Sequence, residues 1–176
     1  TYYKEKCKEE SAMLKDITVA KYFLSKDKDR KLFNKKVVHL NGRIFYEGNA
    51  RLNKYLHLAQ NIYIAETGNK LFDEDLYAYD NGAVVSDIQE NYSLLLSRHD
   101  TPEMPEKDRA FLDKIYKIFE NAPLEELIEL SHEDSEWINK HDYYKKPDQR
   151  MNSLSHANEY QKQYEDIIKV MKRMDK

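Results

Sequence analysis

Apolar residues recur at helical spacing in six stretches of the chain, and these stretches predict most of its structure. The clearest is 50–67, where apolar residues fall at i, i+3, i+4, i+7, i+10 and i+11 counted from Leu52, and where Gly68 suits a left-handed helix end. Asp16 and Ser86 are predicted to cap the helices that they begin. The other predicted helices are 16–26, 86–96, 106–121, 124–131 and 154–174.

The segment 36–47 predicts a β-hairpin instead. Asn41 and Gly42 lie between two short apolar runs, and both tolerate the positive φ angles of a type I′ turn. In this register Val38 lies opposite Phe45, so the two side chains share one face. Because a lone two-stranded hairpin is only marginally stable in water, this one is expected to pack on helices.

The predicted fold class is mainly α with some β, a compact helical domain of about six to seven helices with one small hairpin insert. Residues 70–85 are expected to be irregular or short strand, with Gly82 permitting a backbone geometry that a side chain would block. The length favours a single domain, 1–176. Within it, 1–15 is either a helical or a flexible arm, and the sequence leaves both open.

Charge and cysteine content narrow the classes of partner. The chain has 29 Lys and Arg against 32 Asp and Glu, a net charge of −3, so it has no global basic excess for nucleic acid. The run 26–31 alternates in sign and predicts a solvated connection. No apolar run is long enough to span a membrane, which predicts a cytoplasmic protein without a membrane partner. Cys7 is the only cysteine, which excludes an internal disulfide and a multi-cysteine metal site.

The usual motifs of catalysis and cofactor binding are missing from the sequence. Four glycines supply no glycine-rich phosphate loop, and neither GxSxG nor HExxH occurs. His132, Glu133 and Asp134 with His141 are the nearest approach to a metal cluster, and also to a hydrolase site. We interpret His132 instead as internally hydrogen-bonded and packed near Trp137. The sequence therefore predicts no enzyme, no cofactor and no metal.

Tyrosine is unusually frequent, at 14 of the 176 residues. One explanation is an interface, because tyrosine offers a large amphipathic contact area at low entropy cost. The other is the compositional bias of A·T-rich genomes. Tyr143 and Tyr144 precede two lysines, which indicates either an exposed loop or a local contact with nucleic acid.

Three motifs occur in one order along the chain. They are LNKYLHLAQ at 52–60, then LFDE at 71–74 leading to AYDNGAVV at 78–85, then LSHE at 130–133 followed by Trp137. In this order and spacing they resemble the Panacea domain, also called SocA-like, over about residues 16–140. Asn81 and Ala83 stand where the family pattern has Tyr and Pro, and the link carrying the hairpin, about 28–48, is longer than usual.

The resemblance implies a bacterial, non-enzymatic domain that binds a protein toxin and neutralises it. Members of the family include antitoxins and phage-associated proteins, and some act as adaptors that present a toxin to a protease. The alternative partner is another host protein, such as a defence nuclease bound by a phage or mobile-element protein. DNA binding that represses the chain's own operon is less favoured, and a homo-oligomer is left open.

The three motifs imply a set of residues that hold the fold together. Its members are Lys54, Tyr55, Ala59, Tyr79, Gly82, Val84, Val85, Ser131, His132 and Trp137. Contact with a partner is expected outside the shared motifs, in the hairpin, in the N-terminal arm and in the loop near 143. The residues predicted for it are Val38, Phe45, Tyr46, Tyr143 and Tyr144.

Overall fold

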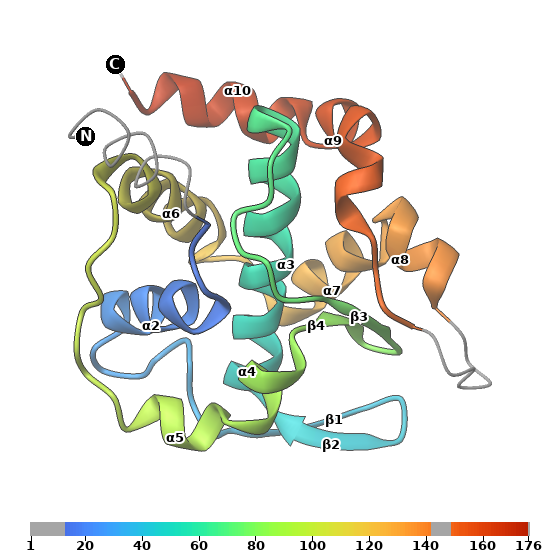
Figure 1. The fold of residues 1–176 in the computed structure, drawn as a ribbon. Coiled ribbons are helices and arrows are strands. Elements are labelled where there is room, and N and C mark those ends of the chain that lie inside the picture. The colour runs from blue at the N-terminus through green and yellow to red at the C-terminus, as the bar shows by residue number, and fades with distance from the viewer. Residues whose placement is uncertain (1–12, 142–148, 176) are drawn as a thin grey trace.

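The computed structural model describes residues 13–141 and 149–175 (Figure 1) and confirms the mainly helical fold class. Two small antiparallel sheets of two strands each accompany the helices. The helices are α2 (Asp16–Lys26), α3 (Glu47–Thr67), α4 (Ser86–Glu90), α5 (Tyr92–Leu96), α6 (Glu106–Phe119), α7 (Leu124–His132), α8 (Ser135–Lys140), the 3₁₀ helix η1 (Ser153–His156), α9 (Ala157–Gln163) and α10 (Glu165–Arg173). The strands are β1 (Val37–Leu40), β2 (Arg43–Tyr46), β3 (Tyr77–Tyr79) and β4 (Gly82–Val84).

Helix α3 is the centre of the fold, with α2 and α6 on one side and α7, α8 and α9 on the other (Figure 1). It begins three residues earlier than predicted and ends as predicted at Gly68, whose φ is 74°. The apolar stripe from Leu52 to Ile62 is fully buried, which accounts for its strong periodicity. Within 13–141 and 149–175, no helix combines the length and apolarity needed to cross a bilayer.

The predicted N-caps Asp16 and Ser86 are wrong by one residue, because both are the first residues inside their helices. The backbone N–H of Asp16 donates to Glu74 Oε1 at 2.8 Å, so a distant acid takes one of the free donors at the start of α2. The cap of α4 is Val85, whose N–H donates to Asn53 Oδ1 at 2.9 Å. Tertiary partners thus replace the local caps.

Two helices predicted as continuous are broken. Asn91 separates α4 from α5, and its side chain donates to the Asp87 carbonyl at 2.8 Å, in competition with the helical backbone. Tyr164 separates α9 from α10 with φ −103° and ψ 17°. Tyr160, in α9, and Tyr164, at the bend itself, are both buried. Burial of aromatic side chains therefore takes precedence over helix continuity.

The first hairpin, β1–β2, has the predicted register, with Val38 opposite Phe45. The turn residues Asn41 and Gly42 have φ angles of 52° and 75°, as a type I′ turn requires. One face of the hairpin is half-buried, whereas Ile44 on the other face is 68% exposed. The Asn41-Gly42 signal therefore predicted the turn, and the register that it sets predicted the buried face.

The second hairpin, β3–β4, lies in the segment predicted to be irregular or short strand. It pairs Ala78 with Ala83, both fully buried. The backbone N–H of Ala78 donates to the Gln149 carbonyl at 2.9 Å, so a segment near the C-terminus pairs alongside. Asn41 Nδ2 donates to Asn81 Oδ1 at 2.7 Å and joins the turns of the two hairpins.

The alternating charges of 26–31 predicted a solvated connection after α2, but two of these charges are engaged with the protein. Asp27 is buried, and its carboxylate accepts the backbone N–H groups of Lys31, Leu32 and Phe33. Arg30 has a φ of 52° and donates to backbone carbonyls at the end of α2 and after α5. Both charges therefore satisfy buried backbone groups rather than water.

Candidate functional site

A buried polar network lies against α3, and it consists of His57, Asn61, Ser131, Asp134, Tyr160 and Tyr164. His57 is at its centre and is fully buried. Its Nδ1 lies 2.7 Å from Ser131 Oγ, and its Nε2 lies 2.6 Å from Asp134 Oδ2. Helix α3 supplies the imidazole, the end of α7 supplies the hydroxyl, and Asp134 is the N-cap of α8. The network therefore joins three helices through one ring.

Donors from other elements fix the carboxylate of Asp134 in its ionised form. Asn61 Nδ2 donates to Oδ2 at 2.8 Å, and the Tyr160 hydroxyl donates to Oδ1 at 2.7 Å. Burial alone raises the pKa of Asp134, but hydrogen bonds from His57, Asn61 and Tyr160 outweigh it and lower the pKa to about 2. Asn61 also donates to the hydroxyl of Tyr164 at 3.0 Å, which carries the network into the C-terminal helices.

Ser131, His57 and Asp134 have the order of hydrogen bonds found in a serine-nucleophile triad. The three side chains are fully buried, however. Ser131 Oγ also accepts the backbone N–H of Ala83 at 2.9 Å, in addition to its contact with His57 Nδ1. None of the three lines the cavities beside the hairpins or beside Arg150. A substrate carbonyl has no room at Ser131, and the arrangement instead ties β4 to α3 and α7.

Lys54 is a buried amine directly beside the network, with 1% of its surface exposed. Its Nζ donates to the Ala83 carbonyl at 2.8 Å, and burial lowers its pKa to about 7. Gly82, with φ +105°, packs so closely that an added Cβ would lie 2.4 Å from Lys54 Cε and 2.8 Å from Ser131 Oγ. The second hairpin is therefore seated on α3 and α7 at a position that only glycine fits.

Trp137 is stacked between two histidines at the turn of the second hairpin. Its ring lies 4.1 Å from that of His132 and 4.2 Å from that of His141. Trp137 Nε1 donates to the Tyr79 carbonyl at 2.9 Å, and His132 Nε2 donates to the Asp80 carbonyl at 3.0 Å. Burial lowers the pKa of His132. His132 thus has the internal hydrogen bond and the Trp137 contact that the sequence predicted.

The structure brings most of the ten motif residues to one place, around β4, α3 and the end of α7. Tyr55 and Ala59 lie elsewhere on α3, in the apolar core, where the Tyr55 hydroxyl donates to the Phe119 carbonyl at 2.9 Å. Val84 and Val85 are buried beside Gly82. The predicted role of these ten residues, holding the fold together, stays a prediction.

The residues predicted for partner contact are less accessible than expected. Val38, Phe45 and Tyr46 are all half-buried. The exposed apolar positions of the same hairpin are Val37 at 52% and Ile44 at 68%. Tyr143 and Tyr144, and residues 1–12 of the predicted arm, lie outside the described residues.

Sequence reasoning missed His57, Asn61 and Asp134 as members of the network. The signal available was a pair of polar residues, four positions apart, on the face of the helix at 50–67 that lies opposite its apolar stripe. A matching pair, Tyr160 and Tyr164, has the same spacing in the last helix. Polar residues on two buried helix faces must hydrogen-bond to something, and here they bond to each other through Asp134.

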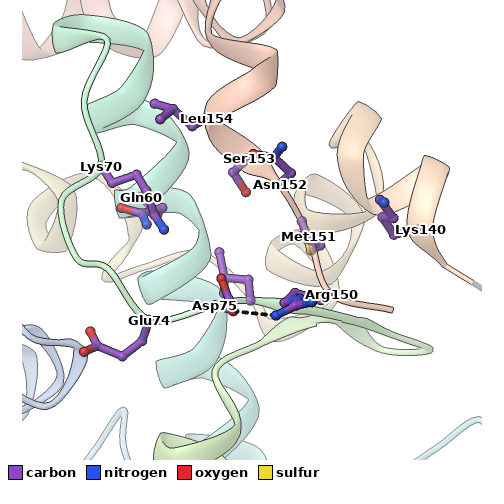
Figure 2. Close-up of a pocket in the computed structure, with 11 residues that line it drawn as sticks. Gln60, Lys70, Glu74, Asp75, Lys140, Arg150, Met151, Asn152, Ser153 and Leu154 are labelled. Atoms are coloured by element: carbon purple, nitrogen blue, oxygen red, sulfur yellow. Dashed lines mark ion pairs between the residues drawn. The ribbon is translucent and has the colours of Figure 1, made fainter. Parts of the chain in front are cut away.

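A cavity of about 330 Å³ lies beside η1, where charges of both signs face it (Figure 2). Lys70, Lys140 and Arg150 line it together with Glu74 and Asp75, and Arg150 pairs with Asp75 at 3.8 Å. This mixture selects no single ligand class. Among the described residues, no three His, Cys, Asp or Glu side chains are grouped to hold a metal ion.

The family model described as "Antitoxin SocA-like, Panacea domain" matches residues 52–138. This range begins after the first hairpin and contains the three motifs, His57, Asp134 and Trp137, whereas His141 of the Trp137 stack lies beyond it. The predicted resemblance is therefore confirmed over a shorter range than 16–140: residues 52–138, just under half of the chain, match the Panacea family model. No curated protein and no solved structure matches the chain.

Proposed function

We propose that this chain is a non-enzymatic antitoxin, which neutralises a cognate protein toxin by binding it directly. The observation that carries the proposal is the match of residues 52–138 to the SocA-like antitoxin family. The geometry supports it, because the one triad-like arrangement described here, Ser131–His57–Asp134, is sealed in the interior. A protein whose polar chemistry is used to hold its own helices together acts on others through its surface.

The mechanism we propose is steric occlusion of the toxin by a surface that includes the first hairpin. This hairpin lies outside the matched range and presents Val37 and Ile44 to solvent. Exposed apolar side chains surrounded by charges are typical of a site for a protein partner. The matched region positions the hairpin, since Asn81 in its β-turn bonds to Asn41.

The decisive experiment is co-expression of the full chain with the protein encoded next to it in the native genome. We expect the neighbour alone to stop growth, and co-expression to restore growth and yield a stable complex on gel filtration. The variant Ser131→Ala is the control for hidden catalysis, and at a temperature where it is folded it should still restore growth. Restoration without a complex, or its loss in folded Ser131→Ala, would overturn the proposal.

A further inference from the structure

We propose that the outer edge of β1, together with Arg51, forms a docking groove for an extended segment of a partner protein, and that a carboxylate of this segment binds Arg51. The inference rests on the proposed function only in naming the toxin as the natural partner. The groove itself can be tested with the antitoxin chain and a peptide. We call it the β1 groove, and its residues are Val37, Val38, His39, Leu40, Arg51 and Leu124.

The outer edge of β1 has free backbone groups. In an antiparallel ladder, pairs that exchange hydrogen bonds alternate with pairs that do not. Leu40 and Arg43, next to the two-residue turn, are a hydrogen-bonded pair, so His39 and Ile44 are a pair without hydrogen bonds to each other. The hydrogen bond from the Glu47 N–H to the Lys36 carbonyl, at 2.7 Å, fits the same alternation. The N–H and C=O groups of Val37 and His39 therefore point away from β2. No described residue outside the hairpin supplies these groups with a backbone partner.

This free edge is one wall of a cavity of about 440 Å³. All four residues of β1 line it and none of β2 does. The opposite wall is the start of α7, at Pro123, Leu124 and Glu125, where Leu124 supplies a buried apolar surface. A strand edge facing an apolar wall is the geometry in which an added strand gains main-chain hydrogen bonds and a side-chain pocket.

Arg51 supplies a charge that the protein leaves without a counter-ion. Its side chain lines the cavity, although the residue is only 6% exposed. Its Nη1 donates to the Ala122 carbonyl at 2.8 Å, while its Nε has no hydrogen-bond partner. Within the described ranges, no carboxylate lies within the 4.0 Å of an ion pair with Arg51. A buried guanidinium without its counter-ion is costly, so an incoming carboxylate gains more here than at an exposed arginine.

The neighbouring acids do not fill this role. Glu47 lies 3.9 Å from Lys36 and is engaged with it, and Glu125 is exposed. Helix α7 begins after Pro123 with Glu125 and Glu126 in its first turn, so these carboxylates offset the positive end of the helix dipole. The attraction for a negatively charged ligand therefore comes from Arg51 and not from the start of α7.

The ligand we expect is a segment of another protein rather than a second copy of this chain. Self-pairing would bring a second β1, whose sequence Val-Val-His-Leu contains no acid and is preceded by two lysines. Such a strand leaves Arg51 without a carboxylate and places like charges together. A free small anion, in turn, makes no use of the N–H and C=O groups along β1. An extended acidic segment supplies both a carboxylate for Arg51 and backbone partners for the free N–H and C=O groups of β1.

The test uses ¹⁵N-labelled full-length chain titrated with short peptides and followed by NMR. The probes are acetyl-Glu-Thr-Val-Thr-Val-Thr-amide and acetyl-Thr-Val-Thr-Val-Thr-Glu-amide, each with a Gln counterpart. We expect shifts at the amides of Val37 and His39 and at Arg51 Nε, with at least one Glu peptide binding about ten-fold more tightly than its Gln counterpart. Equal affinities for Glu and Gln, or shifts at Ile44 without shifts at His39, would overturn the proposal.

A pair of proline variants separates the two edges of the hairpin. His39→Pro removes a free N–H on the β1 edge, and Ile44→Pro removes the N–H of the directly opposite residue on the β2 edge. We expect His39→Pro to weaken peptide binding at least ten-fold and Ile44→Pro to leave it within two-fold. Equal effects of the two variants contradict docking on the β1 edge. A dimer of the wild-type chain that His39→Pro dissociates would contradict it in favour of self-pairing.

Arg51→Gln tests the carboxylate contact and should abolish the preference for Glu over Gln while leaving the β1 amide shifts in place. Its thermal unfolding is measured alongside, because the variant also removes a buried charge. If the peptides bind as expected but no neighbouring toxin is neutralised, the groove stands and the antitoxin function fails. If a toxin is neutralised equally well by wild type and folded His39→Pro, the function stands and the groove fails.

Discussion

The two hairpins of this protein differ in what holds their turns in place. The first turns at Asn41 and Gly42, and a Cβ added to Gly42 would meet nothing within 4 Å. The second turns before Gly82, where an added Cβ would meet Lys54 and Ser131. The first is built by local sequence and stands at the surface, whereas the second is built by the helices beneath it. Only the second lies in the range that matches the Panacea family.

This difference separates two kinds of constraint on the chain. The second hairpin is fixed by contacts with α3, α7 and α8, so a change there disturbs the interior. The first is constrained mainly by its turn and by one half-buried face, so its outer residues can vary at little cost in stability. A protein that must fit one partner is expected to vary where stability permits it, which agrees with a partner surface at the first hairpin.

The largest expected effect comes from comparing Gly82→Ala with Gly42→Ala. Both glycines have positive φ, at +105° and +75°, so both variants incur about 1 kcal/mol of backbone strain. Only Gly82→Ala also forces a methyl group against Lys54 and Ser131, which brings its loss to about 4 kcal/mol. Urea unfolding followed by circular dichroism measures both. Similar losses for the two variants would show that the second hairpin is not held as tightly as described.

The next effect concerns the buried amine beneath the second hairpin. Lys54 has a pKa of about 7 in the folded protein, against about 10.4 when unfolded. Between these values the unfolded chain binds more protons, so stability should rise with pH, by about 3 kcal/mol from pH 7 to about 9.5. Lys54→Met should remove this rise. Lys36→Met, at an exposed lysine beside the first hairpin, should retain it.

A smaller loss is expected for Ser131→Ala, which leaves the backbone N–H of Ala83 and the Nδ1 of His57 without their partner. Leaving buried polar groups unsatisfied should lower the free energy of unfolding by about 2 kcal/mol. Ser155→Ala, at an exposed hydroxyl that bonds only to the Asn152 carbonyl, is the matched control and should change it by less than about 0.5 kcal/mol. A loss of equal size in both would argue against the network as a source of stability.

The smallest effect is expected for Asn81→Ala, which removes the hydrogen bond from Asn41 and a long one, of 3.5 Å, to the Leu40 carbonyl. Because the first bond is exposed and the second is long, the free energy of unfolding should fall by only about 0.5 kcal/mol. Faster amide exchange should be confined to the first hairpin, since the second keeps its contacts with the helices. Faster exchange in β3 and β4 as well would mean that the two hairpins open as one unit.

Local signals predicted the parts of the fold that depend on local rules. Spacing and backbone preference alone predicted the Asn41-Gly42 turn and the register of β1 and β2. They also predicted the bounds of α2 and the C-terminal end of α3. They did not predict the break at Tyr164, because it depends on which tyrosines find a buried place. They did not predict the break at Asn91 either, because spacing does not show that this side chain bonds to the Asp87 carbonyl. Arg30 and Asp27 looked like solvent-exposed charges, since nothing in the sequence shows that distant carbonyls and amides need them.

The candidate site was predicted in the same uneven way. The motif residues Lys54, Gly82 and Ser131 do come together. The imidazole beside Ser131, however, is that of His57 and not that of the sequence neighbour His132. Helical geometry explains this, since adjacent residues point about 100° apart on a helix. Which of two histidines faces a serine is decided by the packing of α3 on α7, which no local pattern specifies.

The hydrogen bonds of Tyr160 and Tyr164 bear on where this molecule can be cut or recombined. Both tyrosines lie beyond residue 138, yet their hydroxyls complete the surroundings of Asp134 and Asn61. A gene fragment limited to residues 52–138 would therefore encode a core in which the Asp134 carboxylate is exposed and the places of Tyr160 and Tyr164 are empty. Recombination can therefore exchange the first hairpin at little cost in stability, but must keep the last helices together with the range that they complete.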